Sequence, residues 1–246
     1  MSLQVVSSSD GSNTAFSTMF QEHYHSTNDG ALNETFEKHI TPVFELLKNS
    51  EELVILDICF GLGYNTLATL YFRDRYFPEK KVTIYSPEFD KELVSSLETF
   101  EYPEIFQEYK KVINEVSKNN FYEDKNTKIE LYIGDAREYL KVLQKREVNC
   151  NVLYQDAFSP STNPLLWTQE YFDDVTKLLS YEAVVTTYSI ALKVRLALHN
   201  CGFNLYTLDH ETLRISSIAA KQNLNLKKVD MEHKIACNRE VEALRD

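Results

Sequence analysis

The sequence predicts an α/β fold with a doubly wound, Rossmann-like sheet that is mostly parallel. Short continuous apolar runs, of which residues 53–60 (LVILDICF) are the strongest, are typical of strands covered on both faces of a parallel sheet. These runs alternate regularly with segments of helical periodicity, which is the pattern of strand–helix–strand units. A closing pair of strands completes the pattern. We therefore expect a seven-stranded sheet with an antiparallel last strand.

Each expected element has its own signal in the sequence. Residues 1–20 are rich in Ser, Thr, Asn and Gly and predict a loose or strand-like leader. Residues 33–47 carry apolar side chains at helical spacing that Thr41-Pro42 interrupts, which predicts one broken helix or two short ones. We expect strands at residues 53–60, 82–86, 128–133, 149–154, 183–188, 203–208 and 213–219, and helices at residues 65–77, 90–118 with a break near Pro103, 135–144, 168–179 and 190–200.

Length and composition limit the organisation of the chain. Its 246 residues, 43% of them hydrophobic, suit one domain of generous size. We expect residues 1–50 to pack as a leader and helices on a catalytic domain of residues 51–221, with residues 222–246 as a C-terminal tail. An apolar run of membrane-spanning length and a signal-peptide pattern are both absent from the sequence. We therefore expect a cytoplasmic protein with no membrane partner.

Charge and cysteine usage exclude some classes of function. The net charge of -11 argues against a protein that binds nucleic acid over its whole surface, because phosphate neutralisation needs Lys and Arg. A basic face within residues 191–228 stays open beside an ordinary mixed surface, which charge alone favours. The four cysteines are widely spaced, and no His, Cys and carboxylate set has zinc-site spacing. We expect reduced thiols and no metal.

Acidic residues fall at or near the ends of four successive expected strands. They are Asp57, Glu88, Asp135 and Asp156. In a doubly wound sheet, ligands bind in the crevice at the carboxyl ends of the strands. We therefore expect these four side chains along one rim, around one ligand.

The turn after the first strand favours a nucleoside cofactor. Gly61 and Gly63 let the backbone approach a ligand closely, and Glu88 can accept hydrogen bonds from both hydroxyls of a ribose. A carboxylate that caps the following helix is the alternative role for Glu88. The G-x-G-x-x-G spacing of nicotinamide enzymes is absent, whereas the D-x-x-x-G-x-G that begins at Asp57 is typical of methyltransferases.

The third and fourth strand ends extend this site. Asp135, after Gly134, can reach the amino group of an adenine, and it can also cap the next helix; the two roles are compatible. Asp156 stands where a methyl acceptor meets the sulfonium, and it can orient an amine or take its proton. The aromatic and proline-containing loop of residues 157–166 predicts a stiff wall. Trp167 is expected as a core residue at a helix start, with stacking on a base as the alternative.

These motifs together resemble the methyltransferase half of the bacterial tRNA-modifying MnmC proteins, which complete 5-methylaminomethyl-2-thiouridine at the wobble position. The resemblance covers most of the chain and is most specific in the segment from Asp156 to Thr168. The matching segments are residues 24–26 and 29–35 (family D-G-L-x-E-T), 57–65 (E-x-G-F-G-x-G-x-N), Glu88, Gly134-Asp135, 155–160 (L-D-G-F-A-P) and 163–168 (N-P-x-x-W-T).

The chain also departs from the family pattern. Cys59 stands where the family has the first glycine of its turn. The basic stretch before the last strand is reduced to residues 212–216, where Arg214 alone keeps a positive charge. The oxidase half of the fused members is missing, so we expect a stand-alone methyltransferase.

The resemblance implies a class I methyltransferase that uses S-adenosyl-L-methionine and no metal. It implies attack by the neutral primary amine of a 5-aminomethyl-(2-thio)uridine of tRNA on the cofactor methyl, and a functional link to the enzymes that make this aminomethyl precursor. Asp156 is the expected catalytic residue. Cofactor contacts are expected from Asp57, Phe60, Gly61, Gly63, Asn65, Glu88, Gly134, Asp135 and Asp156, and acceptor contacts from Tyr24, Glu34, Phe158, Pro160, Trp167 and Arg214.

Two other functions stay open at the level of the sequence. A methyltransferase or aminopropyltransferase-like enzyme acting on a small, polyamine-like amine is consistent with the charge of -11. A binding module that has lost catalysis is consistent with Cys59 in the glycine turn. Salt-dependent binding of tRNA separates the first alternative from the leading hypothesis, and binding of S-adenosylmethionine separates the second.

Overall fold

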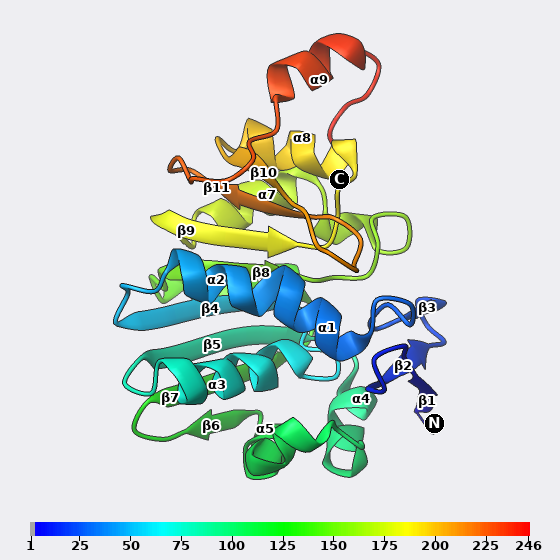
Figure 1. The fold of residues 1–246 in the computed structure, drawn as a ribbon, viewed down its shortest axis with the longest axis vertical. Helices are drawn as coiled ribbons and strands as arrows, with labels where there is room; N and C mark the ends of the chain where they lie inside the picture. Colours follow the sequence, from blue (N-terminus) through cyan, green and yellow to red (C-terminus); the bar gives the residue numbers. More distant parts are fainter. Residues whose placement is uncertain (1–2) are drawn as a thin grey trace.

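The computed structural model describes residues 3–246 and shows an eight-stranded sheet with helices on both faces (Figure 1). The strand order is β10-β11-β9-β8-β4-β5-β7-β6. The five strands from β9 to β7 are mutually parallel. The strands are β4 (Glu52–Ile58), β5 (Lys81–Glu88), β6 (Phe121–Glu123), β7 (Thr127–Ile133), β8 (Cys150–Gln155), β9 (Leu179–Thr187), β10 (Asn204–Leu208) and β11 (Ser216–Ala220).

Alternating side chains of the central strand build a core on each face of this sheet. Leu53 and Ile55 of β4 pack against one set of helices, and Leu56 and Ile58 pack against the other. The first set is α1 (Ala31–Thr35), η1 (Phe36–Ile40), α2 (Thr41–Leu46), α3 (Tyr64–Tyr76) and α5 (Lys110–Asn119), and the second is α6 (Ala136–Lys145), α7 (Gln169–Thr176) and α8 (Leu192–Asn200). The remaining helical segments are α4 (Lys91–Ser96), η2 (Leu97–Thr99), η3 (Glu104–Tyr109), η4 (Pro164–Leu166) and α9 (Met231–Cys237).

The doubly wound sheet and the antiparallel last strand are confirmed, but the strand count of seven is wrong. β11 pairs antiparallel with both β9 and β10, as expected. The additional strand is β6, which lies antiparallel on β7 at the edge of the sheet. Asp124 closes the turn between them by accepting the backbone N–H groups of Asn126 and Thr127. A strand of three residues beside such a turn carries no periodicity that the sequence could reveal.

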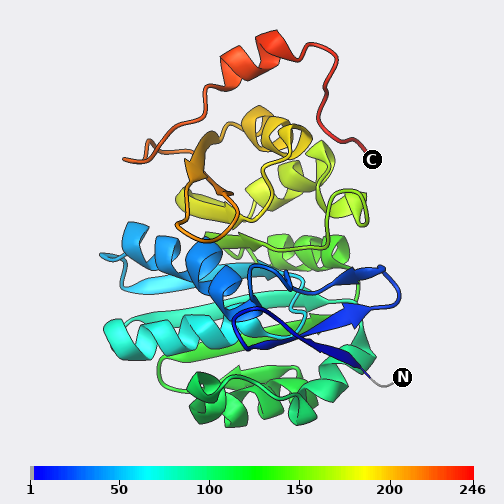
Figure 2. The same cartoon turned by 45° about the vertical axis from the view of Figure 1, so that its right-hand side comes forward.

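The leader forms a separate three-stranded antiparallel sheet. Its strands are β1 (Gln4–Ser7), β2 (Asn13–Ser17) and β3 (Glu22–His23). The strand-like interpretation of this segment is therefore confirmed. Figures 1 and 2 place the leader sheet, drawn in dark blue, at the carboxyl ends of the parallel strands.

A π-helical turn joins α1 to α2, where the sequence predicts a broken helix. The N–H of Thr41 donates to the carbonyl of Phe36, five residues back, so η1 contains one more residue than an α-helical turn. Pro42 follows at once, and it has no N–H to continue the α-helical hydrogen bonding. The chain thus runs from residue 31 to residue 46 as one helix with a wide turn in its middle.

The segment after α9 returns to the sheet domain. The N–H of Gln169 donates to the carbonyl of Leu244 over 2.8 Å. The carboxylate of Asp246 accepts two hydrogen bonds of 2.7 Å from the guanidinium of Arg137 and one of 2.8 Å from Thr168. These contacts hold residues 241–246 against the start of α6 and of α7.

Candidate active site

A cavity of about 540 Å³ opens where the carboxyl ends of β4, β5, β7 and β8 face the leader. This volume is within the range of pockets that bind small molecules and cofactors. The cavity collects most of the residues that the sequence assigns to one site. The assigned residues that line it are Tyr24, Glu34, Phe60, Gly61, Asn65, Glu88, Gly134, Asp135, Asp156, Phe158 and Arg214.

The turn after β4 has a backbone that suits glycine. Cys59, Gly61 and Gly63 have φ angles of 70°, 55° and 76°, in the left-handed region that side chains disfavour. A Cβ atom on Gly63 would lie 3.0 Å from the side chain of Ile113, so this position is also crowded. This backbone geometry explains why the MnmC pattern has a glycine at position 59. Cys59 adopts the same conformation with a side chain.

Glu88, at the end of β5, is held against this turn. Its Oε2 accepts the N–H of Gly61 over 2.8 Å, and its Oε1 accepts the N–H of Asp90 over 2.8 Å. Burial raises the pKa of Glu88, although these two hydrogen bonds oppose the rise. Each carboxylate oxygen has two lone pairs. Glu88 can therefore accept further hydrogen bonds from a ligand in the cavity.

Asp135, after β7, caps the next helix with one oxygen. Its Oδ1 accepts the N–H groups of Arg137 and Glu138 over 2.8 and 3.1 Å. The helix-capping role is therefore present, and the residue also lines the cavity beside Gly134. The two roles that the sequence allowed are compatible in the structure.

Asn65 joins two carboxylates at the base of the cavity. Its Nδ2 is 3.2 Å from Asp57 Oδ1 and 3.1 Å from Asp156 Oδ2. Burial raises the pKa of Asp57 well above its ordinary value. For Asp156, burial acts in the same direction, but His39, His25 and Asn65 outweigh it and lower the pKa. Burial and the neighbouring groups therefore shift the two pKa values in opposite directions, upward for Asp57 behind Asn65 and downward for Asp156 in the cavity wall.

Two buried histidines beside Asp156 are residues that sequence reasoning missed. His39, on η1, has its Nε2 3.5 Å from Asp156 Oδ1 and its Nδ1 2.8 Å from the hydroxyl of Thr186. His25, after β3, lines the cavity, and burial lowers its pKa. His25 lies between the aromatic residue and the serine of the matching segment 24–26, and His39 belongs to none of the matching segments. A polar residue on the apolar face of the broken helix was the one available signal for His39.

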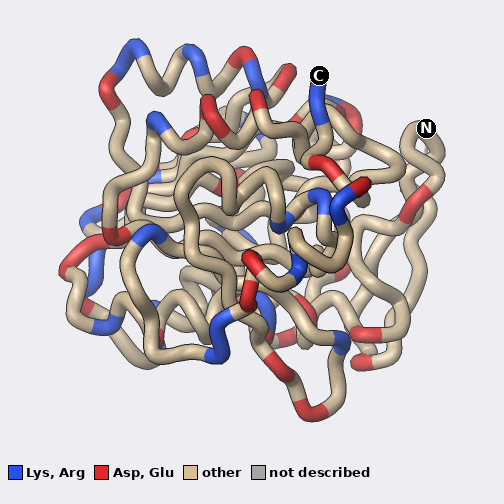
Figure 3. Tube along the Cα trace, turned by 90° about the horizontal axis from the view of Figure 1, so that it is seen from above, with Lys and Arg blue, Asp and Glu red and all other residues tan. Residues whose placement is uncertain are grey.

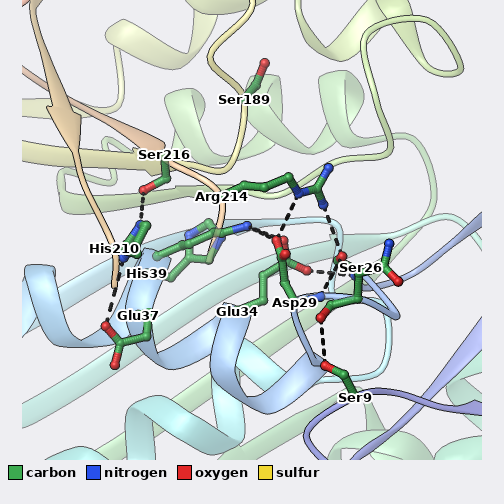
Figure 4. A network of polar contacts seen from close by, with 12 residues as sticks. Ser9, Ser26, Asp29, Glu34, Glu37, His39, Ser189, His210, Arg214 and Ser216 are labelled. Atoms are coloured by element: carbon green, nitrogen blue, oxygen red, sulfur yellow. Dashed lines mark hydrogen bonds and ion pairs between the residues drawn. The ribbon is translucent and has the colours of Figure 1, made fainter. Parts of the chain in front are cut away.

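A buried charge network connects the leader, α1, η1 and the β10–β11 loop (Figure 4). Lys38 Nζ is 2.7 Å from Asp29 Oδ2 and 2.8 Å from Glu34 Oε1. Burial raises the pKa of Asp29, but Lys38 and then Arg214 outweigh that effect and lower it. Arg214 donates to Asp29 over 3.2 Å and to Ser26 Oγ over 3.1 Å. Arg214 thus ties the β10–β11 loop to the leader at the cavity wall.

Aromatic side chains form one wall of the cavity. The ring of Phe158 stacks on Phe20 at 4.6 Å between centroids and lies 5.1 Å from the ring of Tyr24. Glu22 Oε2 accepts the N–H and the hydroxyl of Ser159 over 3.2 and 3.0 Å, which fixes the loop to the leader. This wall suits a planar group.

Four assigned residues lie outside the cavity wall among residues 3–246. Trp167 is fully buried, and its indole N–H donates to the carbonyl of Phe158 over 2.8 Å, so it is the core residue, and its assignment to acceptor binding is corrected. Asp57 accepts a hydrogen bond from the lining residue Asn65, and Gly63 is the N-cap residue of α3. Pro160 follows the wall residues Phe158 and Ser159 and is half-buried outside the cavity lining, so its acceptor contact stays a prediction.

Within the described part of the chain, residues 3–246, no cluster of three or more His, Cys, Asp or Glu side chains is arranged to hold a metal ion. Over the same residues, no helix has the length and apolarity needed to cross a membrane.

The chain belongs to a family of S-adenosyl-L-methionine-dependent methyltransferases, whose model matches residues 100–223, about half of the chain. It is therefore a methyltransferase with S-adenosyl-L-methionine as its cofactor. The crystal structure of MNMC2 from Aquifex aeolicus superposes with a TM-score of 0.85 at 25% identity, covering 100% of this chain and 79% of that one.

Curated relatives agree with this assignment. An MnmC protein of Campylobacter hominis, named for tRNA 5-methylaminomethyl-2-thiouridine biosynthesis, is 30% identical over 168 residues, which are 65% of this chain and 24% of that protein. An uncharacterised protein of Methanocaldococcus jannaschii is 29% identical over 91% of this chain and 60% of its own length. The chain thus spans between a quarter and three fifths of these relatives. The resemblance to the MnmC methyltransferase half is confirmed.

Proposed function

We propose that S-adenosyl-L-methionine binds in the cavity along the turn of residues 59–63. Several features support this site. The lone pairs of Glu88 suit the two hydroxyls of a ribose, and Asp135 suits the amino group of an adenine. Phe60, Gly61, Asn65 and Gly134 supply the wall and the close backbone approach, and Asp57 and Gly63 hold them from behind.

We propose further that the acceptor is the primary amine of a 5-aminomethyl-(2-thio)uridine at the tRNA wobble position, which becomes 5-methylaminomethyl-(2-thio)uridine. The observation that carries this proposal is the ionised Asp156 in the cavity wall, held by Asn65 and His39. Glu34 and Glu22 add negative charge around an incoming ammonium group, and the Phe20–Phe158 pair offers a face for a base. The names of the MnmC relatives support the same substrate.

The residues of the cavity account for the chemistry. An alkylamine has a pKa of roughly 10, so the chain must bind or create its neutral form. Asp156 accepts a hydrogen bond from the amine and orients its lone pair, and it helps to pass the proton that the ammonium form releases to water. When bound, the cofactor supplies a methyl group whose bond to sulfur breaks as its bond to the amine nitrogen forms. The cavity contributes the rest of the catalysis by positioning.

This reaction defines the partners that we propose. The protein acts on tRNA in the cytoplasm, after the enzymes that make the aminomethyl precursor. Tyr24, Glu34, Phe158 and Arg214 are the proposed acceptor contacts, since all four line the cavity beside Asp156. Binding of tRNA should weaken as salt rises, because phosphate contacts release counterions.

The experiment that tests this function is transfer of labelled methyl groups from S-adenosylmethionine to tRNA from a strain that lacks this gene. Nucleoside mass analysis should then show 5-methylaminomethyl-(2-thio)uridine, and the same tRNA with the Asp156→Asn protein serves as the matched control. Label that appears in small amines or in protein, with none in tRNA, would overturn the proposal and favour the small-amine enzyme.

A further inference from the structure

The base of the cavity contains a short chain of polar groups that the proposed reaction does not yet use. It runs from the hydroxyl of Thr186 on β9 through the imidazole of His39 to the carboxylate of Asp156. The Thr186 and His39 side chains are fully buried, whereas the Asp156 side chain is 14% exposed towards the cavity. The chain therefore leads from the core of the sheet to the one carboxylate that we assign to the acceptor.

Hydrogen-bond direction places a hydrogen on Nε2 of this imidazole. An ionised carboxylate only accepts hydrogen bonds, so a favourable contact requires a hydrogen on His39 Nε2. In the neutral ring Nδ1 then accepts, and the Thr186 hydroxyl is the donor 2.8 Å away. The buried Nε2 atom has no hydrogen-bond partner, and Asp156 Oδ1, 3.5 Å away, is beyond the usual length of a hydrogen bond. Such contacts often shorten when the substrate binds.

The backbone explains why the ring points this way. His39 lies in the π-helical turn η1, whose wide turn interrupts the regular spacing between α1 and α2. The ring packs edge-on against Tyr154 of β8, with 5.7 Å between centroids. The ring is thus fixed by Thr186 on one side and by Tyr154 on the other, with Nε2 facing Asp156.

We propose that His39, fixed by Thr186, is a positioning residue for Asp156. It holds Asp156 Oδ1 in place, while Asn65 holds Oδ2, so that the remaining lone pairs face the acceptor amine. This inference rests on the proposed function for the identity of the acceptor. The other titratable groups that face Asp156 are His25 from the leader, Asp57 from β4, Cys59 from the turn and Tyr188 after β9.

Four variants test this role. His39→Phe keeps an aromatic ring but removes both nitrogens, and His39→Gln keeps an N–H donor near the position of Nε2. Thr186→Val keeps the branched shape and removes the hydroxyl. His210→Phe is the matched control, because His210 is another poorly exposed histidine that binds Ser216 over 2.9 Å and does not line the cavity.

We expect His39→Phe to lower kcat by about 10- to 100-fold, as for other residues that orient a functional group, with the Kd for S-adenosylmethionine unchanged within about twofold. His39→Gln should recover much of the loss, Thr186→Val should show a smaller loss, and His210→Phe should match the wild type. In the background of Asp156→Asn, His39→Phe should cause no further loss, since a positioning residue acts through the group it positions.

A second measurement is independent of the substrate. The carboxyl carbon of Asp156, followed by carbon-13 NMR and assigned by its loss in Asp156→Asn, should titrate at higher pH in His39→Phe than in the wild type. An unchanged titration, or a kcat equal to that of His210→Phe, would overturn the role of His39. If His39→Phe does not fold, His39→Gln and Thr186→Val decide by the same two measurements. Failure of the wild type to methylate tRNA would instead refute the proposed function and leave the titration result standing.

Discussion

At the scale of single residues, one amide joins two carboxylates whose pKa values are shifted in opposite directions. Asn65 donates to both Asp57 and Asp156, so the two acids lie close enough to oppose each other's ionisation. Burial raises the pKa of Asp57, whereas His39 and His25 lower that of Asp156 against the effect of burial. Pairs of acids with separated pKa values commonly mark an active site. The lower pKa thus belongs to the acid that faces the cavity.

Asp156→Asn tests the charge on this residue. The amide keeps the size of the side chain but cannot accept a proton, so we expect kcat to fall by about 100-fold or more. The Kd for S-adenosylmethionine should change little, because Glu88 and the glycine turn make the proposed cofactor contacts. Steady-state kinetics and calorimetry measure the two quantities separately. Wild-type turnover in this variant would exclude Asp156 as the catalytic residue.

Cys59→Gly tests the strain in the turn. Cys59 has a φ of 70°, a conformation that costs a residue with a side chain roughly 1–2 kcal/mol. Glycine removes this strain but gains freedom in the unfolded chain, which offsets part of the benefit. We expect the free energy of unfolding to rise by about 0.5–1 kcal/mol in urea titrations, with cofactor binding retained. The same replacement at Cys237, on the exposed helix α9, should lower stability instead.

The acids of the site could be predicted from the sequence because each follows a strand whose apolar run is unmistakable. Glu88, Asp135 and Asp156 were found in this way, and the structure places all three around one cavity. The role of His39 could not be predicted in this way, because its position depends on the π turn and on Thr186, which lies far away in the sequence. Trp167 is the core residue that its place at a helix start predicts, and its full burial excludes the alternative of stacking on a base.

At the scale of elements, the leader caps a helix to which it is not adjacent in sequence. Gly30 precedes α1 and provides no side chain for capping. The N–H groups of Ala31, Leu32 and Asn33 donate instead to Ser8, Ser12 and Asp10, three residues of the leader. These are the N–H groups that an isolated helix leaves without partners. The capping therefore couples the leader sheet to the helix that carries Glu34, Lys38 and His39.

Asp10→Ala tests this coupling. The substitution removes the hydrogen bonds that Asp10 accepts from Ser8, Ser12 and the N–H of Asn33. We therefore expect the free energy of unfolding to fall by about 1–2 kcal/mol at pH 7. Hydrogen exchange at residues 31–33 should accelerate. Asn13→Ala is the control, because Asn13 is a neighbouring leader residue whose side chain binds Ser7 and the Glu101 carbonyl and does not cap α1. Equal exchange in the two variants would refute the capping role.

The pH dependence of this difference has a defined sign. Burial alone would raise the pKa of Asp10, but the hydrogen bonds from Ser12, Asn33 and Ser8 lower it below the ordinary 3.8. A depressed pKa in the folded state adds stability above the ordinary value, and this contribution is lost as the pH falls through the folded pKa. The stability difference between wild type and Asp10→Ala should therefore be constant near neutral pH and shrink below pH 3.8. Urea titrations at several pH values measure it.

Helices and strands can be predicted where apolar residues recur at regular spacing over a long segment. Short segments that depend on tertiary contacts are harder to predict. The parallel strands and the break at Pro103 follow from the sequence, and both appear in the structure. The β6 strand and the late start of β11 at Ser216 do not. Residues 213–215, expected to begin the last strand, belong to a loop because Arg214 leaves the sheet for Asp29 and Ser26.

At the scale of the whole molecule, the cavity lies between parts of the chain that are distant in sequence. The leader and the 157–166 loop close its aromatic wall, and Arg214 ties the β10–β11 loop to the same leader. Positive and negative side chains are interspersed along the chain in Figure 3, in keeping with the net charge of -11. If tRNA is the substrate, as we propose, the cavity rather than one continuous basic segment contributes much of the selectivity.

A ligand held by so many separate segments should stabilise the whole fold. At a free concentration of one hundred times its Kd, S-adenosylmethionine adds about 2.7 kcal/mol to the free energy of unfolding. For a chain of this length, that corresponds to a rise in Tm of about 5–10 °C. Glu88→Gln replaces the charge that we propose to accept the ribose hydroxyls, so the Kd should rise by about 10- to 100-fold and about half or more of the shift should disappear at the same concentration. Glu79→Gln, an exposed acid outside the cavity, should keep the full shift. Differential scanning fluorimetry with and without the cofactor compares the three proteins, and an equal shift in all of them would place the ribose away from Glu88.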